Sequence, residues 1–283
     1  MTAPIRNFHD RVTLAIEGHI ATVSLNRPDK YNGLDLEMMR GLVACAKTIK
    51  KNRDVRVVIL RGEGKAFCAG LDFATVTKTP LKMLLAFTKF GVKKTNLFQQ
   101  ACWAWRELPV PVIAVLHGYC YGGGLQLALA ADFRIATPDC ELSVMESKWG
   151  LIPDMTGTVT LRELVPMDVA KELAMTGRRF DAVEAKTLHL VTQVAEQPEQ
   201  AARALADAIL TRSPDAVSAT KDGATARLVA ILGEWQQFLR RAAAAPSGAE
   251  WRFGSTNALA VRRYSADVDE HEATAVDESH PAA

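Results

Sequence analysis

Two glycine-containing segments could bring backbone N–H groups close to a ligand. The first runs from Gly64 to Asp72 (GKAFCAGLD), the second from His117 to Gly124 (HGYCYGGG), and each follows a predicted buried strand. Glycine allows a ligand to approach the backbone closely. Where such a turn opens a helix, the first N–H groups have no intrahelical acceptor and favour negative charge. Two such N–H groups from two turns would form an oxyanion hole.

Neither segment has the pattern of a nucleotide-binding loop. The G-x-x-x-x-G-K-[ST] pattern is absent, and Gly122–Gly124 lacks both the G-x-G-x-x-G spacing and the acidic residue about 20 positions further on. Triple glycines also occur where chains pack tightly. Both interpretations, anion binding and close packing, therefore stay open at this point.

Three polar residues downstream could move protons: Gln126, Glu146 and Asp154. The segment 142–157 is apolar and interrupted by glycine and proline, so its two acids are expected to be partly desolvated. Burial raises the pKa of a carboxyl group towards values that are useful for proton transfer. The alternative is that both acids cap helices or lie on the surface.

The spacing of apolar residues predicts an α/β fold in which these segments follow strands. Alternation or continuous apolar runs predict strands over 12–16, 21–25, 55–60, 113–116 and 133–136. Helical spacing predicts helices over 34–51, 81–107, 125–131, 167–176, 181–189, 198–211 and 214–241. We therefore expect an α/β core over 1–165, a helical region over 166–264 and a flexible acidic tail over 265–283.

Composition narrows the class of protein. The 283 residues are 48% hydrophobic and 23% charged, which is typical of a globular protein, and the net charge of +2 favours neither nucleic acid nor a membrane as partner. The start has no signal-like apolar region, and no apolar run approaches the ~20 residues that span a bilayer. Five cysteines without metal-ligand spacing argue against a disulfide framework or a metal site. A cytoplasmic protein is expected.

These motifs, taken in order, resemble the crotonase (enoyl-CoA hydratase/isomerase) superfamily. The resemblance covers roughly residues 10–240 and rests on Asn26-Arg27-Pro28 with Lys30 and Asn32, on the segment 65–72, on His117-Gly118-Tyr119 with Gly122–Gly124, on Glu146 and on Gly150-Leu151-Ile152-Pro153. The segment from Glu184-Ala185 to Val194 also resembles the family's helix and short strand after the core. It implies a spiral of repeated ββα turns with a helical C-terminal trimerisation region. It also implies homotrimers or hexamers, an acyl-CoA thioester as ligand, and no cofactor beyond the coenzyme A of the substrate.

The resemblance also implies roles for particular residues. The peptide N–H groups of Leu71 and Gly123 would hold the thioester oxygen. Coenzyme A and the acyl group would be bound by Arg27, Lys30, Lys65, Ala66, Ala69, Gly70, Asp72, Tyr121 and Gly122. Arg27 and Lys30 suit phosphates, although ion pairing within the protein is equally open, and Asp72 is expected to cap or orient its turn.

One departure from the family pattern decides the predicted reaction. The family's hydratases carry glutamate where this chain has Gln126, and an amide cannot accept a proton from water as a carboxylate does. Asp154 falls where the family's dienoyl-CoA isomerases carry an aspartate. We therefore predict double-bond isomerisation, 3-enoyl to 2-enoyl or 3,5-dienoyl to 2,4-dienoyl. The alternatives are 2-enoyl-CoA hydration, acyl-CoA binding without catalysis, and aryl-CoA dehalogenation with Asp154 as nucleophile.

Overall fold

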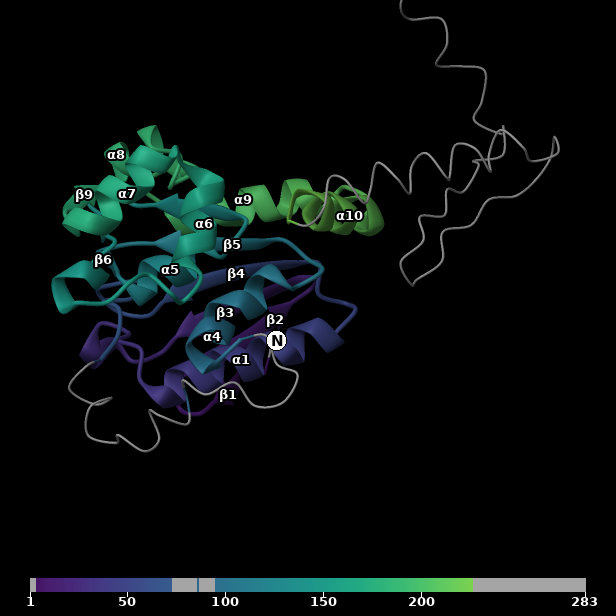
Figure 1. The fold of residues 1–283 in the computed structure, drawn as a ribbon. Coiled ribbons are helices and arrows are strands. Elements are labelled where there is room, and N and C mark those ends of the chain that lie inside the picture. The colour runs from purple at the N-terminus through teal and green to yellow at the C-terminus, as the bar shows by residue number, and fades with distance from the viewer. Residues whose placement is uncertain (1–3, 73–85, 87–94, 226–283) are drawn as a thin grey trace, which may run out of the picture. The chain divides into compact units, whose positions relative to one another are not determined.

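The computed structural model describes residues 4–72, 86 and 95–225 (Figure 1). Within these residues the larger sheet has the strand order β1-β2-β3-β4-β5-β7-β10. Its strands are β1 (Arg6–Phe8), β2 (Val12–Glu17), β3 (Ile20–Leu25), β4 (Val57–Gly62), β5 (Val112–Leu116), β7 (Phe133–Ala136) and β10 (Gln193–Val194). The pairs β1–β2 and β2–β3 are antiparallel, and the pairs from β3 to β10 are parallel. The strands predicted over 12–16 and 21–25 form a hairpin, and the predicted α/β class is confirmed.

The parallel strands β4 and β5 are buried on both faces, which explains their continuous apolar sequences. On one face, Val58 and Leu60 belong to the core that includes residues of α1 (Leu36–Lys51) and α4 (Leu97–Arg106). On the other, Val57 and Ile59 pack with residues of α9 (Pro198–Leu210). Helices α1 and α4 lie side by side (Figure 1). The period of two along each strand thus fills two separate apolar layers.

A smaller sheet of β6 (Tyr119–Tyr121), β8 (Glu141–Ser143) and β9 (Arg179–Asp181) supports the second glycine segment. Strand β6 leads directly into α5 (Gly123–Leu129), and β8 is followed by the short 3-10 helix η2 (Glu146–Trp149). Because β6 and β8 are parallel neighbours, the elements that follow them, α5 and η2, begin at the same edge of this sheet. The sheet therefore brings the triple glycine close to Glu146.

The expected domain boundary near residue 165 is not a boundary in the structure. The segment after it contains α7 (Met167–Thr176), α8 (Ala182–Thr187) and α10 (Pro214–Thr225), but it also contributes β9 and β10. Strand β10 pairs with β7, β9 pairs with β8, and Met1–Thr225 form one compact unit. Strand pairing with the core thus joins the two expected parts. The remainder of the expected helical region, 226–264, and the tail, 265–283, lie outside the described residues, as does most of 81–94.

Helix α10 is attached to the core through a buried lysine. The ammonium of Lys221 lies 2.8 Å from Asp132 Oδ2 and donates to the carbonyl oxygens of Val110 and Trp105. Burial lowers the pKa of this lysine, and the Asp132 carboxylate opposes that shift. A buried ammonium requires such partners, so the contact fixes α10 against the loop before β5.

All five cysteines are unpaired and buried. Burial raises the pKa of Cys45, Cys68 and Cys140 to about 12 and that of Cys102 and Cys120 well above the ordinary value. Thiols in such surroundings are chemically inert. Among the helices of the described ranges, none is both long enough and apolar enough to cross a bilayer.

Candidate active site

One cavity of about 230 Å³ brings together the residues that the sequence singles out for chemistry. Its wall includes Leu71 from the first glycine segment, Gly123 and Gln126 from α5, Glu146 from η2, and Asp154 from the loop that follows. The rest of the lining is mostly apolar, with Phe98, Met145, Trp149 and Met155 among the contributors. An apolar cavity with a few polar groups is typical of a small-molecule site.

The backbone leaves two N–H groups for a ligand in this cavity. Leu34 donates from N to the Gly70 oxygen at 2.8 Å and accepts from the Asp72 N–H at 3.1 Å. This parallel bridge skips the N–H of Leu71, which has no backbone acceptor among the described residues. Gly123 is the first residue of α5, so its N–H has no intrahelical acceptor. Both N–H groups belong to the residues that the family resemblance implies as oxyanion donors.

Close approach of the two glycine segments requires glycine at several positions, among them Gly70 and Gly124. Gly70 has φ +91°, and a Cβ there would lie 2.8 Å from the Tyr121 oxygen and 3.7 Å from the Gly123 nitrogen. A Cβ on Gly124 would lie 2.4 Å from the Cys68 oxygen. Both interpretations of the triple glycine therefore apply, at different residues. Gly124 permits close packing, and Gly123 presents an N–H to the cavity.

The amide of Gln126 has its orientation fixed by the backbone. The N–H of Gly157, the first residue of α6 (Gly157–Leu164), donates to Gln126 Oε1 at 2.8 Å. Since a backbone N–H can only donate, the oxygen of the amide must face Gly157. The amide nitrogen then donates to Glu146 Oε1 at 2.5 Å. Gln126 therefore acts as a fixed hydrogen-bond donor to Glu146.

Glu146 is a buried carboxyl group with one uncommitted oxygen. Its Oε1 accepts from Gln126, whereas its buried Oε2 has no hydrogen-bond partner among the described residues. Burial raises its pKa, the hydrogen bond from Gln126 lowers it, and the nearby Asp154 raises it. The net shift is upward, so Glu146 holds a proton more readily than an exposed glutamate. Oε2 is the atom available to exchange that proton.

Asp154 is the second carboxyl group of the cavity. Its side chain is partly exposed, and burial raises its pKa. It lies two residues before Thr156, a buried β-branched residue held at φ +101°. Such a backbone conformation costs energy and is concentrated at functional sites. Nothing in the sequence indicated this strain, nor the donor role of Gly157 that follows it.

The residues expected to bind coenzyme A divide into two groups. Ala69, Gly70, Tyr121 and Gly122 line the cavity, together with the two N–H donors. The Tyr121 hydroxyl donates to Glu141, and burial, followed by this neighbouring carboxylate, raises the pKa of the tyrosine. Its ring rather than its hydroxyl is therefore available to the cavity.

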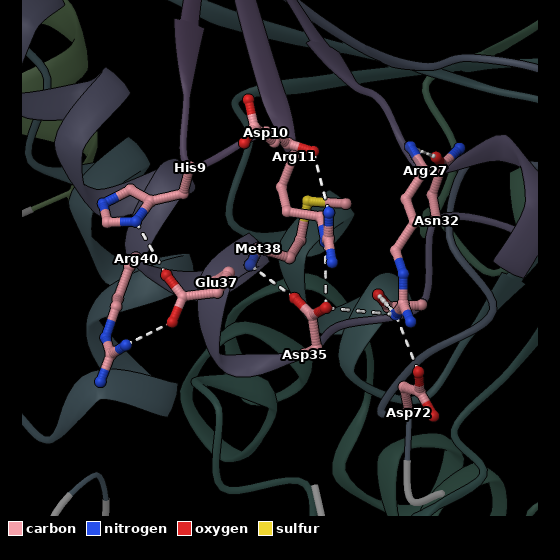
Figure 2. Close-up of polar contacts among 11 residues, drawn as sticks. His9, Asp10, Arg11, Arg27, Asn32, Asp35, Glu37, Met38, Arg40 and Asp72 are labelled. Carbon is pink, nitrogen blue, oxygen red and sulfur yellow. Dashed lines mark hydrogen bonds and ion pairs between the residues drawn. The ribbon is translucent and has the colours of Figure 1, made fainter. Parts of the chain in front are cut away.

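The remaining expected ligands lie outside the cavity wall. Lys30 and Lys65 are exposed, and Ala66, within the first glycine segment, is buried. Arg27 is bound to Asp72 and Asp35 (Figure 2). Of the two roles left open for Arg27, the structure shows ion pairing. Asp72 also has its expected place in the turn, since its backbone N–H donates to Leu34.

Comparison with known proteins supports the resemblance. The family model described as enoyl-CoA hydratase/isomerase matches residues 15–238. The chain is 40% identical to YngF of Bacillus subtilis (strain 168) over 206 residues, which are 72% of this chain and 76% of that protein.

Two solved structures also support the resemblance to this family. The crystal structure of an enoyl-CoA hydratase from Bacillus anthracis has a TM-score of 0.72 at 32% identity, covering 83% of this chain and 90% of that one. A Thermobifida fusca YX protein solved in complex with acetoacetyl-CoA has a TM-score of 0.70 at 29% identity, covering 84% and 96%. These matches agree with the mixed α/β fold and with the cavity that holds two N–H donors and two carboxyl groups. The chain therefore belongs to the enoyl-CoA hydratase/isomerase family, the crotonase superfamily.

Proposed function

We propose that this enzyme moves a carbon–carbon double bond in an acyl-CoA thioester through an enolate intermediate. The substrates would be 3-enoyl esters converted to 2-enoyl esters, or 3,5-dienoyl esters converted to 2,4-dienoyl esters. The similarity to a protein that binds acetoacetyl-CoA supports a coenzyme A thioester as ligand. The arrangement of the cavity supports enolate chemistry.

The two free N–H groups would stabilise the intermediate. When the α-proton leaves, the electron pair of the C–H bond moves into the thioester and places negative charge on its oxygen. Donors from Leu71 and Gly123 would hold that oxygen, and they cost no reorganisation because the backbone already presents them. Loss of one such donor typically lowers the rate by about 10²–10³.

The two carboxyl groups would transfer the proton. For a 3-enoyl ester the proton moves from C2 to C4, and Glu146 alone can remove and return it. For a 3,5-diene it leaves C2 and returns at C6, which is too far for one carboxylate. Asp154 would then remove the α-proton and Glu146 would deliver one, as the family resemblance implies. The raised pKa of each group suits both steps.

The observation that carries this proposal is the fixed amide of Gln126. It gives Glu146 a hydrogen-bond donor where a second carboxylate would be needed to activate water. Hydration of 2-enoyl-CoA is the second candidate, favoured by the similarity to the Bacillus anthracis enoyl-CoA hydratase. We propose that no cofactor takes part beyond the coenzyme A of the substrate; neither route changes the overall oxidation state of the acyl group, so neither needs a redox cofactor. We also propose a homotrimer or hexamer in the cytoplasm.

A substrate panel tests the proposal. The purified protein is incubated with 2-enoyl-, 3-enoyl- and 3,5-dienoyl-CoA esters of several chain lengths, and products are followed by mass and ultraviolet absorbance. Isomerisation leaves the mass unchanged and alters conjugation, whereas hydration adds one water. Faster hydration than isomerisation would favour the second candidate, and binding without turnover of any ester would contradict both.

A further inference from the structure

Arg27 lies at the centre of a buried ion-pair network (Figure 2). Its Nη1 lies 2.8 Å from Asp72 Oδ2 and 3.5 Å from Asp35 Oδ2, and it donates to the Gly33 oxygen at 3.1 Å. The side chain is only 10% exposed. These contacts commit Nη1 of the guanidinium to groups of the protein.

A second arginine belongs to this network. Arg11 Nε donates to Asp35 Oδ2 at 3.0 Å, so that two guanidinium groups face two carboxylates. A phosphate that approached Nη1 of Arg27 would have to compete with Asp72 and Asp35 for it. Removing one partner from a buried ion pair is strongly unfavourable. Nη1 of Arg27 is therefore unsuited to hold a phosphate while this network is intact.

The network reaches the oxyanion hole through the residue next to Leu71. The carboxylate of Asp72 is held by Arg27, and its backbone N–H is held by the Leu34 oxygen. Gly70, on the other side of Leu71, is held by the Leu34 N–H. The peptide that presents the Leu71 N–H is therefore fixed at both ends.

The other end of the network is equally rigid. Asp35 follows Leu34 directly, and its Oδ1 accepts from the Met38 N–H at 2.7 Å, which caps helix α1. Arg27 thus connects two carboxylates: Asp35, fixed to the start of a buried helix, and Asp72, next to the donor peptide.

We propose that Arg27 is a positioning residue that holds the Leu71 N–H in place through Asp72. This inference rests on the proposed function, since it assigns the Leu71 N–H to the thioester oxygen. An error of about 1 Å in the position of a catalytic group costs up to about 10² in rate. Loss of the Arg27–Asp72 contact should therefore weaken the polarisation of the thioester carbonyl.

The test measures that polarisation without requiring turnover. Butyryl-CoA and butyryl-pantetheine, each labelled at the carbonyl carbon, are bound to the wild type, to Arg27→Met and to Asp72→Asn. Difference infrared spectroscopy then gives the carbonyl stretching frequency of each bound thioester. The pantetheine ester has no phosphate, so any contact between Arg27 and phosphate is absent from it.

We expect the wild type to lower the carbonyl frequency of both esters and the two variants to lose a similar part of that shift. On a substrate that is turned over, kcat should fall by about tenfold to a hundredfold for both the CoA and the pantetheine ester. Arg27→Lys should restore part of the shift. Arg11→Met is the matched control, because it removes a guanidinium from Asp35 and none from Asp72; it should keep the wild-type frequency.

Three results would overturn the assignment. An unchanged frequency in Arg27→Met and Asp72→Asn, with weaker binding of butyryl-CoA alone, would make Arg27 a phosphate ligand. An unchanged frequency with unchanged binding would leave Arg27 a structural residue. A wild type that does not shift the carbonyl would overturn the oxyanion hole itself. A shifted carbonyl without isomerisation would instead contradict only the proposed reaction and would support the assignment if the variants lose the shift. Asp72→Asn, which preserves side-chain shape, provides the test if Arg27→Met does not fold.

Discussion

Gln126 determines how Glu146 can exchange a proton. In Gln126→Glu, one oxygen of the new carboxylate can still accept from the Gly157 N–H. The other oxygen replaces the amide NH₂ that donates to Glu146, so a negative charge stands where a donor stood. The two acids would share a proton, and the activity that needs Glu146 ionised should develop at higher pH. We expect hydration of 2-enoyl-CoA to rise by about 10². Product mass and the pH profile of kcat/KM measure both effects.

Gln126→Met is the matched control for this prediction, since it keeps the length of the side chain and introduces no acid. It should lose the hydrogen bond to Glu146 without gaining hydration. Hydration that stays unchanged in a folded Gln126→Glu protein still able to bind butyryl-CoA would contradict our account of the site.

Substitution of the two carboxyl groups, Asp154 and Glu146, should affect different substrates. Asp154→Asn removes the proposed base for dienes, so it should lower 3,5-dienoyl isomerisation by about 10²–10⁴ and spare 3-enoyl isomerisation. Glu146→Gln should lower both to a similar extent. Steady-state rates for both esters, with circular dichroism as the check on folding, decide the point. Full activity of Glu146→Gln on every ester would exclude this mechanism.

Burial of Glu146 should also affect stability in a pH-dependent way. Its pKa in the folded protein is raised above the ordinary value of 4.5. Between these two pKa values the folded state binds more protons than the unfolded state, so the free energy of unfolding falls as pH rises through this range. Glu146→Gln has no carboxyl group at this position, so its free energy of unfolding does not fall in this way. It should melt a few degrees above the wild type at neutral pH.

The same linkage predicts that this advantage of Glu146→Gln disappears below pH 4.5, where the glutamate is protonated in both states. Thermal unfolding of both proteins on either side of this value provides the measurement. An advantage of equal size at both pH values would show that charge burial is not its cause.

At the scale of elements, the role of the N–H donor at the start of α5 can be tested by replacing Gly123 with a residue that has no N–H. Proline is tolerated at the first position of a helix, so Gly123→Pro deletes the donor there while the helix can remain. We expect kcat to fall by at least about 10². Gly123→Ala is the matched control: it keeps the N–H and adds a Cβ 3.0 Å from the ends of two flexible side chains, Leu34 and Met155. Equal losses of kcat in the two variants would show that crowding, not the donor, matters.

Elements in which apolar residues recur at regular spacing were predictable from the sequence. Short strands that form only by pairing with other strands were not. The hairpin of β2 and β3 and the buried strands β4 and β5 follow from alternation and β-branched runs. Strands β6, β8 and β9 have three residues each, too few to show a period, and depend on their partners. Helix α6 was missed because Thr156, at its start, has a left-handed conformation that its residue type disfavours.

The site itself was predictable in its members but not in its contacts. The motifs located Leu71, Gly123, Glu146 and Asp154, which the structure places in one cavity. The fixed amide of Gln126 was not predictable, because it depends on the Gly157 N–H, 31 residues away. Nor could the sequence choose between phosphate binding and ion pairing for Arg27, since its partner Asp72 belongs to a different turn. Contacts of this kind arise only when the whole chain has folded.

The reactivity of the buried cysteines can be used to measure local opening across the whole molecule. They lie in α1, the first glycine segment, α4, β6 and the loop before β8, so each marks a different part of the core. A thiol reagent should leave the native protein unlabelled and modify a cysteine only when its part of the fold opens. Mass spectrometry of samples taken over time would therefore rank these regions by the free energy of opening. Labelling of Cys68 in the native protein as fast as in an unfolded peptide would contradict its full burial.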